Sequence, residues 1–200
     1  MLVIMKVKFV NQFIDGSEIN MDKIYPRTVP DRDSKYMGQA WIQASFSKDP
    51  NTQVGAVIVT SDNIPLSSGY NGPPSAINDD SFSWCRVPEY EGGLTKYDLV
   101  RHAEINAMDY SNLSDLSNAV LYVTALPCPS CMLEIAKKRV SRVVYYDFQS
   151  TSNSSLQNSA WRNKSMEIAA LGNVQVDLFE GNLSWLLDWT KKMQDLGIFK

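Results

Sequence analysis

Residues 102–131 have the sequence HAEINAMDYSNLSDLSNAVLYVTALPCPSC, in which a helical pattern gives way to a buried strand and then to the start of a second helix. Apolar side chains at helical spacing predict a helix over Arg101–Asn112. The run from Ala119 to Thr124 is short and mostly apolar, which predicts a strand. A second helix is expected over Cys131–Val140. Helices and strands in this order are typical of a sheet with crossover connections.

The same alternation continues on both sides of this segment. A helix with an apolar face from Met37 to Ala44 is expected to end at Asp49-Pro50-Asn51, because a residue before proline is disfavoured in the α region. The further expected elements are strands over Val54–Thr60, Ile64–Tyr70, Arg142–Tyr146 and Val174–Phe179, and helices over Ala160–Leu171 and Leu183–Leu196. The pattern predicts an α/β fold, a three-layer α/β/α sandwich around a mixed five-stranded central sheet with one hairpin.

Two internal stretches lack a regular pattern. Residues 72–99 are expected to form a long loop, which in a compact domain is usually functional. The Ser- and Asn-rich residues 149–159 are expected to form a second loop. The sequence before residue 34 is the least regular, with one candidate strand over Lys6–Phe13. We therefore expect an N-terminal extension over residues 1–33 and a single domain over residues 34–200.

The composition is that of a globular protein, with 200 residues, 44% of them hydrophobic and 20% charged, and a net charge of −3. It excludes a disordered chain, a collagen and a coiled coil. The acidic balance argues against a protein that holds an extended phosphate backbone. Three cysteines do not make a disulfide framework, and no signal peptide or membrane span is recognisable. We therefore expect a cytoplasmic protein of a bacterium or of a virus-infected cell.

Two cysteines and the single histidine stand where metal ligands are expected. Cys128 and Cys131 are three residues apart at a helix start, which puts both sulfurs on one face, and the positive end of the helix dipole favours their thiolates. His102 stands at the start of the other helix. Two such starts can offer one nitrogen and two sulfurs to a zinc ion and leave its fourth position open, as in catalytic sites. Glu104 is then close enough to transfer a proton.

The combination H-x-E…P-C-x-x-C is typical of zinc-dependent nucleobase deaminases. The sequence resembles this superfamily over about residues 34–146, and within it the deoxycytidylate (dCMP) deaminases. The segments that carry the resemblance are SKDPNTQVGAVIV (47–59), SGYNGPP (68–74), NDDSFSW (78–84), HAEINA (102–107) and LYVTALPCPSC (121–131). The sequence departs from the family at Ser75-Ala76-Ile77, where members usually have a glycine and a cysteine.

The resemblance implies a cytidine deaminase-like fold and the hydrolytic deamination of dCMP to dUMP and ammonia, which supplies dUMP for dTTP synthesis. It implies a catalytic zinc ion held by His102, Cys128 and Cys131. Glu104 would take the proton of the attacking water and pass it to the base. It further implies a homohexamer that dCTP activates and dTTP inhibits, with Mg²⁺ on the triphosphate effector.

Further residues are expected to contact the substrate or an effector. By the resemblance, Asn71 faces the nucleotide sugar, although an Asn-Gly pair is also a common turn. The backbone of Ala103 and Pro127 would hold the pyrimidine edge. Asn51 and Lys48 are candidates for sugar and phosphate contacts, with an ordinary loop role as the alternative. The effector site is expected at Gly72, Asn78, Asp79 and Asp80, where the alternative is a solvated loop.

Other interpretations stay open. A C-x-x-C pair alone could be redox-active or part of a structural zinc site. The chain could deaminate another cytosine or adenine substrate, such as dCTP, a free nucleoside or tRNA. It could also be an inactive, zinc-stabilised interaction protein, which would need a fourth protein ligand. Cys85 is interpreted as a buried or loop thiol, and Trp161, Trp185 and Trp189 as core or subunit-interface residues.

Overall fold

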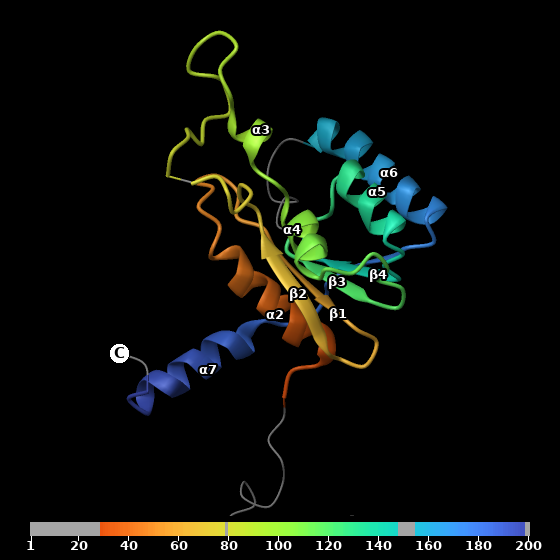
Figure 1. The fold of residues 1–200 in the computed structure, drawn as a ribbon. Helices are drawn as coiled ribbons and strands as arrows, with labels where there is room; N and C mark the ends of the chain where they lie inside the picture. The colour runs from red at the N-terminus through yellow and green to blue at the C-terminus, as the bar shows by residue number, and fades with distance from the viewer. Residues whose placement is uncertain (1–28, 79, 148–154, 199–200) are drawn as a thin grey trace, which may run out of the picture.

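The computed structural model describes residues 29–78, 80–147 and 155–198, which form one sheet with helices on both faces (Figure 1). In chain order the elements are α2 (Arg32–Ala44), β1 (Gly55–Val59), β2 (Pro65–Tyr70), α3 (Lys96–Leu99), α4 (Ala103–Tyr110), β3 (Val120–Val123), α5 (Pro129–Lys137), β4 (Arg142–Tyr145), α6 (Ser155–Leu171), β5 (Gln175–Leu178) and α7 (Ser184–Asp195). No helix in these described ranges is long and apolar enough to cross a membrane. The predicted strand over Lys6–Phe13 and most of the predicted extension over residues 1–33 lie outside the described residues.

The five strands form one mixed sheet in the order β2-β1-β3-β4-β5. β1 is antiparallel to both β2 and β3, whereas β3, β4 and β5 run parallel to one another. β1 and β2 form the predicted hairpin. Pro65 lies in the edge strand β2, as expected for a residue without a backbone N–H. The predicted mixed five-stranded sheet with one hairpin is therefore confirmed.

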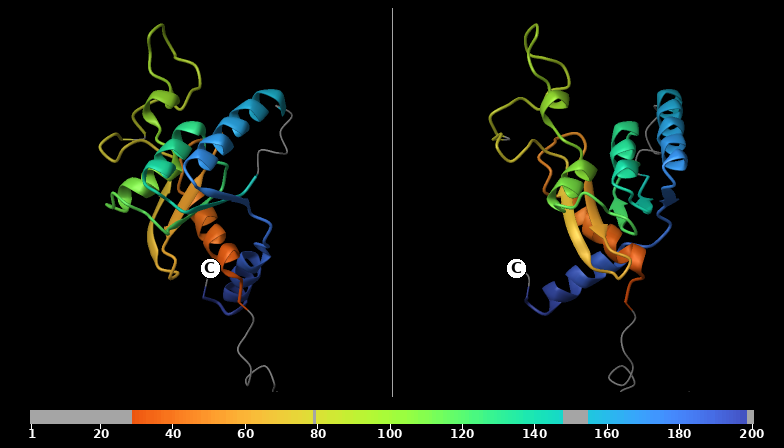
Figure 2. Two further views of the ribbon diagram at one scale, coloured as in Figure 1. Left: turned by 90° about the vertical axis from the view of Figure 1, so that its right-hand side faces the viewer. Right: turned by 45° about the vertical axis from the view of Figure 1, so that its right-hand side comes forward.

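Helices cover the two faces of the sheet (Figure 2). On one face Tyr36, Met37 and Ala40 of α2 pack against β1, β3 and β4. On the other face α4, α5 and α6 pack against the same strands, with Met132 and Ile135 of α5 fully buried. Each strand serves both clusters because its alternate side chains point to opposite faces. The predicted three-layer α/β/α sandwich is confirmed.

Two glycines let helices approach the sheet closely. A β-carbon on Gly55 would overlap the backbone of Ala40 in α2. A β-carbon on Gly69 would lie 2.5 Å from the backbone nitrogen of Ala107 in α4. Side-chain atoms do not fit at such distances, so the close packing of α4 on β2 depends on a glycine in the strand.

The end of α2 differs from the prediction. The helix ends at Ala44, about one turn before the predicted end at Asp49-Pro50-Asn51. The hydroxyl of Ser45 donates to the carbonyl of Ile42 at 2.7 Å, a local bond that competes with further helix. The carboxylate of Asp49 then accepts the N–H of Asn51 at 2.9 Å. Side-chain bonds to the backbone therefore replace the helical ones here.

Two helices extend into segments that are predicted to be loops. α3 lies within residues 72–99, where the N–H of Thr95 donates to Asp98 at 2.8 Å and completes a capping box. α6 begins at Ser155, inside the predicted loop 149–159 and before the predicted start at Ala160. Its first turn, Ser155-Leu156-Gln157-Asn158, has one apolar residue, so apolar spacing does not reveal it. The rest of that loop lies outside the described residues.

Residues 72–101 leave the sheet and return to it, and we call them the arm (Figure 1). The base of the arm is closed by Gly72 and Arg101, whose backbones exchange hydrogen bonds of 3.1 and 2.9 Å. Farther out, the N–H of Lys96 donates to the carbonyl of Cys85 at 3.1 Å. The side chain of Lys96 pairs with Asp49, which ties the arm to the segment after α2.

Candidate active site

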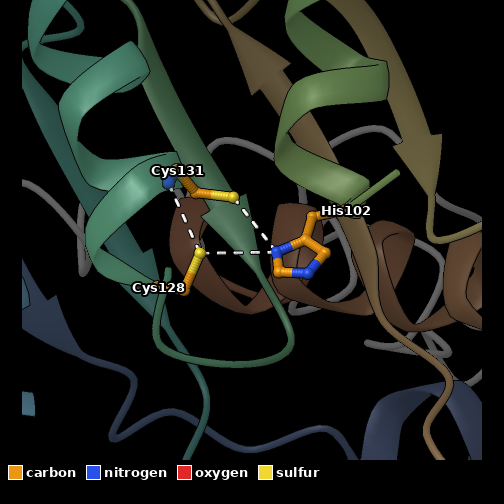
Figure 3. Close-up of side chains that lie close together, drawn as sticks. All are labelled: His102, Cys128 and Cys131. Atoms are coloured by element: carbon orange, nitrogen blue, oxygen red, sulfur yellow. Dashed lines mark hydrogen bonds between the residues drawn. The ribbon is translucent and has the colours of Figure 1, made fainter. Parts of the chain in front are cut away.

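The three predicted metal ligands lie close together beyond the carboxyl end of β3 (Figure 3). Nδ1 of His102 is 3.2 Å from the sulfur of Cys131 and 3.4 Å from the sulfur of Cys128. All three ligand atoms lie within 4.8 Å of one another. One nitrogen and two sulfurs therefore surround a common point.

Two helix starts position these ligands. His102 directly precedes α4 and Cys128 directly precedes α5, both in an extended backbone conformation. The sulfur of Cys128 accepts the N–H of Cys131 at 3.4 Å and so caps α5. From α6, the hydroxyl of Ser165 donates to the carbonyl of Pro127 at 2.6 Å. The chain on the amino side of Cys128 is thus fixed by a helix that contributes no metal ligand.

Hydrogen bonds among the three ligands shift their pKa values. The hydrogen bond from Cys131 lowers the pKa of Cys128 to about 3, although burial alone would raise it. The same hydrogen bond raises the pKa of Cys131. The hydrogen bond with Cys128 raises the pKa of His102 to about 8. The cluster therefore favours a thiolate at Cys128, which is the form of cysteine that binds a metal.

This donor set fits zinc. At the usual Zn–N and Zn–S lengths, tetrahedral ligands lie about 3.5 Å apart, close to the observed 3.2 and 3.4 Å. No fourth His, Cys, Asp or Glu of the described residues joins the group. Three protein ligands match the sets found at catalytic zinc sites, whereas structural sites have four.

Glu104 lies beside this cluster in the first turn of α4. Its side chain is only 4% exposed, and burial raises the pKa of its carboxyl group. It lines the same cavity as His102 and Cys128. A carboxyl group with a raised pKa can accept a proton and give it back during one reaction.

The cavity has a volume of about 230 Å³. Its wall is formed by the segment after α2, the end of β2, the arm, the starts of α4 and α5, and α6. These segments are far apart in the sequence. The cavity therefore exists only when the arm is docked and α6 is packed in place.

Asp49 and Lys96 form a buried ion pair in this wall. Their charged atoms are 2.6 Å apart, and the side chains are 3% and 6% exposed. Burial raises the pKa of Asp49, but the hydrogen bonds from Lys96 and from the backbone of Asn51 outweigh it and hold the pKa below its usual value. The two charges compensate each other, so the pair adds no net charge to the cavity.

Of the residues predicted to bind substrate, Asn71 and Ala103 line the cavity. Both ends of the Asn71 amide are engaged with backbone. Its oxygen accepts the N–H of Val54 at 2.7 Å, and its nitrogen donates to the carbonyl of Thr52 at 2.9 Å. Asn71 therefore holds the segment after α2 in position, whatever it contacts in a ligand.

The other three predicted substrate residues are not part of the cavity wall. Asn51 directs its backbone N–H to Asp49. Lys48 forms an ion pair of 3.0 Å with Asp80. Pro127 is buried, with its carbonyl bound by α6.

The predicted effector residues lie at different places. Gly72 and Asn78 line a second cavity of about 330 Å³, together with Tyr70 of β2 and Asn106 of α4. Asp80 pairs with Lys48 outside that wall. Asp79 lies outside the described residues.

Most of the residues that line the first cavity are not among those predicted, and three of them have large side chains from distant parts of the sequence. Arg86 and Tyr97 come from the arm, and Trp161 comes from α6. No spacing rule links these positions to His102; the length of the arm signals only that it is functional. Trp161 packs against the hydrophobic core, in line with its interpretation as a core residue, and it also lines the cavity. Trp185 is half-buried beside Gly38 of α2.

The family model described as cytidine and deoxycytidylate deaminase zinc-binding region matches residues 30–147. The chain belongs to this deaminase family. The matched range contains the three ligands, Glu104 and the arm, and it ends before α6.

Individual members of the deaminase family resemble the chain over the same part. A human deoxycytidylate deaminase is 40% identical over 110 residues, which are 55% of this chain and 61% of the human protein. A deoxycytidylate deaminase of Mycobacterium phage D29 is 38% identical over 123 residues, which are 58% of this chain and 94% of the phage protein. The chain thus spans about three fifths of the length of the human relative.

Solved structures of the deaminase family share the fold. The dCMP deaminase of cyanophage S-TIM5 in complex with dCMP and dUMP has a TM-score of 0.57 and 24% identity, over 76% of this chain and 100% of that chain. Its apo form has a TM-score of 0.55 over the same shares of the two chains. The cytidine deaminase-like fold expected from the sequence is confirmed.

Proposed function

We propose that the chain is a zinc-dependent enzyme that hydrolyses dCMP to dUMP and ammonia. The observation that carries this proposal is a buried carboxyl group, Glu104, in the same cavity as the imidazole and thiol groups of His102 and Cys128. A group that can transfer protons and two candidate metal ligands thus line one cavity, which a small molecule can enter. The chain has one histidine, and as a metal ligand its Nδ1 would not be free to carry a proton.

Each residue of the site has a role in this reaction. His102, Cys128 and Cys131 would hold zinc, which when bound supplies Lewis-acid activation of water. Glu104 takes one proton from the water and delivers it to N3 of the cytosine. It then carries the second proton to the departing amino group, so that ammonia leaves and the carboxylate is restored. The backbone of Ala103 holds the edge of the pyrimidine ring.

The assignment of dCMP draws on the relatives and on charge. The human and phage relatives are named deoxycytidylate deaminases, and a protein of the same fold was solved with dCMP and dUMP. The net charge of −3 disfavours a polynucleotide substrate. The absence of a fourth protein ligand among the described residues disfavours a purely structural zinc site.

Ammonia release tests the proposal. Zinc-loaded protein is given dCMP, dCTP, deoxycytidine, cytosine or tRNA, and we expect the highest kcat/KM with dCMP. A higher kcat/KM for another of these compounds would show that dCMP is not the preferred substrate, while the chain would still be a deaminase. Lack of release from every substrate contradicts the proposal and favours an inactive, zinc-stabilised interaction protein.

We also propose, from the family resemblance, that dCTP activates and dTTP inhibits the enzyme, each bound with Mg²⁺. The 330 Å³ cavity beside Gly72 and Asn78 is the site that we assign to these effectors. A homohexamer, a cytoplasmic location and a role in supplying dUMP for dTTP synthesis complete the proposal. The dCMP assay with each triphosphate added, and the mass of the protein in solution, test the regulation and the assembly.

A further inference from the structure

One basic side chain of the 230 Å³ cavity has no compensating charge among the residues that the structure describes. Lys96 is paired with Asp49 at 2.6 Å, and His102 belongs to the ligand cluster. Arg86 also lines the cavity. Within the described part of the chain, no carboxylate and no hydrogen-bond acceptor engages its guanidinium. A cation that faces a ligand cavity without an internal partner is available to an anionic group of the ligand.

The backbone beside Arg86 is anchored although its side chain is exposed. The carbonyl of Cys85 accepts the N–H of Lys96 at 3.1 Å. The side chain of Lys96 is itself buried against Asp49. The backbone next to Arg86 is therefore held in the cavity wall, and a segment that is already positioned loses less conformational entropy when a ligand binds.

The charged groups of the cavity lie at different depths. Glu104 is 4% exposed and stands beside the metal ligands, whereas Arg86 is exposed to solvent. A ligand whose reacting ring reaches the buried Glu104 has its other end nearer to solvent, and Arg86 is the exposed cation of the same cavity wall. In a nucleotide, the phosphate is at the far end from the base. A guanidinium binds a phosphate through two parallel hydrogen bonds.

We propose that Arg86 binds the 5′-phosphate of the substrate and so selects nucleoside monophosphates over nucleosides. This inference rests on the proposed deaminase function, for which it names the phosphate-binding residue. Lys48, the residue predicted for that role, is already paired with Asp80 at 3.0 Å and is not part of the cavity wall.

The test compares substrates with and without the phosphate. Wild type, Arg86→Ala, Arg86→Lys and the control Arg139→Ala are assayed with dCMP and with deoxycytidine. Arg139 is an exposed arginine that pairs with Asp115, away from the cavity wall. We expect Arg86→Ala to lower kcat/KM for dCMP by about 10- to 100-fold and to leave deoxycytidine unchanged. Arg86→Lys should recover only part of the loss, because an ammonium lacks the fork of the guanidinium.

A binding measurement gives a second readout that does not depend on turnover. Titration calorimetry with dUMP should show an affinity about 10-fold or more weaker in Arg86→Ala, with deoxyuridine binding unchanged. The inference would be overturned if Arg86→Ala lost the same affinity for dUMP and for deoxyuridine, or if it lost no affinity for dUMP. If wild type releases ammonia from deoxycytidine as readily as from dCMP, the enzyme does not select for the 5′-phosphate. The proposal that Arg86 gives this selectivity is then wrong, while the proposal of a deaminase is not affected. If wild type releases no ammonia at all, the deaminase proposal fails, and dUMP titration still decides whether Arg86 binds the phosphate.

Discussion

His102 and Glu104 are two residues apart, yet both line the same cavity. Within a helix, residues with this separation point to roughly opposite sides. His102 has an extended backbone with φ −72° and ψ 153°, and helical geometry begins only at Ala103. His102 is therefore outside the helix, and the direction of its side chain is not set by helical geometry. This change of conformation between neighbouring residues is what lets an imidazole and a carboxyl group converge.

Exchange of Glu104 for glutamine tests the proton transfer directly. Glu104→Gln keeps the size and the burial of the side chain but cannot take up a proton from water. We expect normal zinc content and dUMP binding, with turnover of dCMP reduced by about 10²- to 10⁴-fold. Metal analysis, calorimetry and ammonia release measure the three quantities.

The matched control for that exchange is Glu134→Gln. Glu134 is on α5, where it pairs with Lys137 at 3.0 Å and is not part of the cavity wall. This variant should turn over dCMP at the wild-type rate. Near-normal turnover in Glu104→Gln would show that another group moves the proton.

The sequence predicts that His102, Cys128 and Cys131 lie together, as they do in the structure, because their placement depends on local spacing. His102, Glu104, Cys128 and Cys131 stand at two helix starts, and helix starts can be recognised from the sequence. Arg86 and Trp161 reach the cavity through the path of the arm and the packing of α6. Such contacts depend on tertiary structure, for which no local pattern exists.

Among the elements, the arm is tied to the segment after α2 by the buried ion pair of Asp49 and Lys96 next to the cavity. Asp49→Asn would leave the ammonium group of Lys96 buried without a counter-charge. We expect a loss of about 3–5 kcal/mol in the free energy of unfolding, seen as a lower melting temperature. The double variant Asp49→Asn/Lys96→Met should recover most of it, because no unpaired charge remains. Equal melting temperatures for the single and the double variant would contradict this explanation.

The same pair has a predictable dependence on pH. Because the folded state lowers the pKa of Asp49, the stabilisation is fully present above the unfolded pKa of about 4 and is lost as the pH falls through the folded pKa. The difference in melting temperature between wild type and Asp49→Asn should thus be constant near neutral pH and narrow below about pH 4. Thermal melts at several pH values measure it.

Helix boundaries were predicted less well than the helices themselves. Apolar spacing marks the face that a helix buries, and it is silent where a turn is polar. This is why the start of α6 at Ser155 and the end of α2 at Ala44 differ from the predictions. At Ala44 the hydroxyl of Ser45 bonds to the carbonyl of Ile42 and competes with further helix. Apolar spacing does not reveal such a bond.

For the whole molecule, a metal at His102, Cys128 and Cys131 would join the starts of α4 and α5, which pack on the same face of the sheet. Binding to the folded state alone stabilises it by mass action. Chelation should therefore lower the melting temperature, and added zinc should restore it. Cys128→Ala should lose this response.

Cys85→Ala is the matched control for the response to zinc. Cys85 is an exposed cysteine outside the ligand group. We expect its variant to respond to zinc as the wild type does, measured by the same thermal melts. A melting temperature that zinc leaves unchanged in the wild type would contradict the assignment of the metal site.

α6 lies beyond the range that the family model matches, yet it contributes to the site twice. Trp161 lines the cavity, and Ser165 holds the carbonyl that precedes Cys128. Part of the cavity wall is thus encoded outside the range that contains the ligands and Glu104. A substitution at Trp161 can therefore change which molecules the cavity accepts while the ligand set and the proton carrier stay the same.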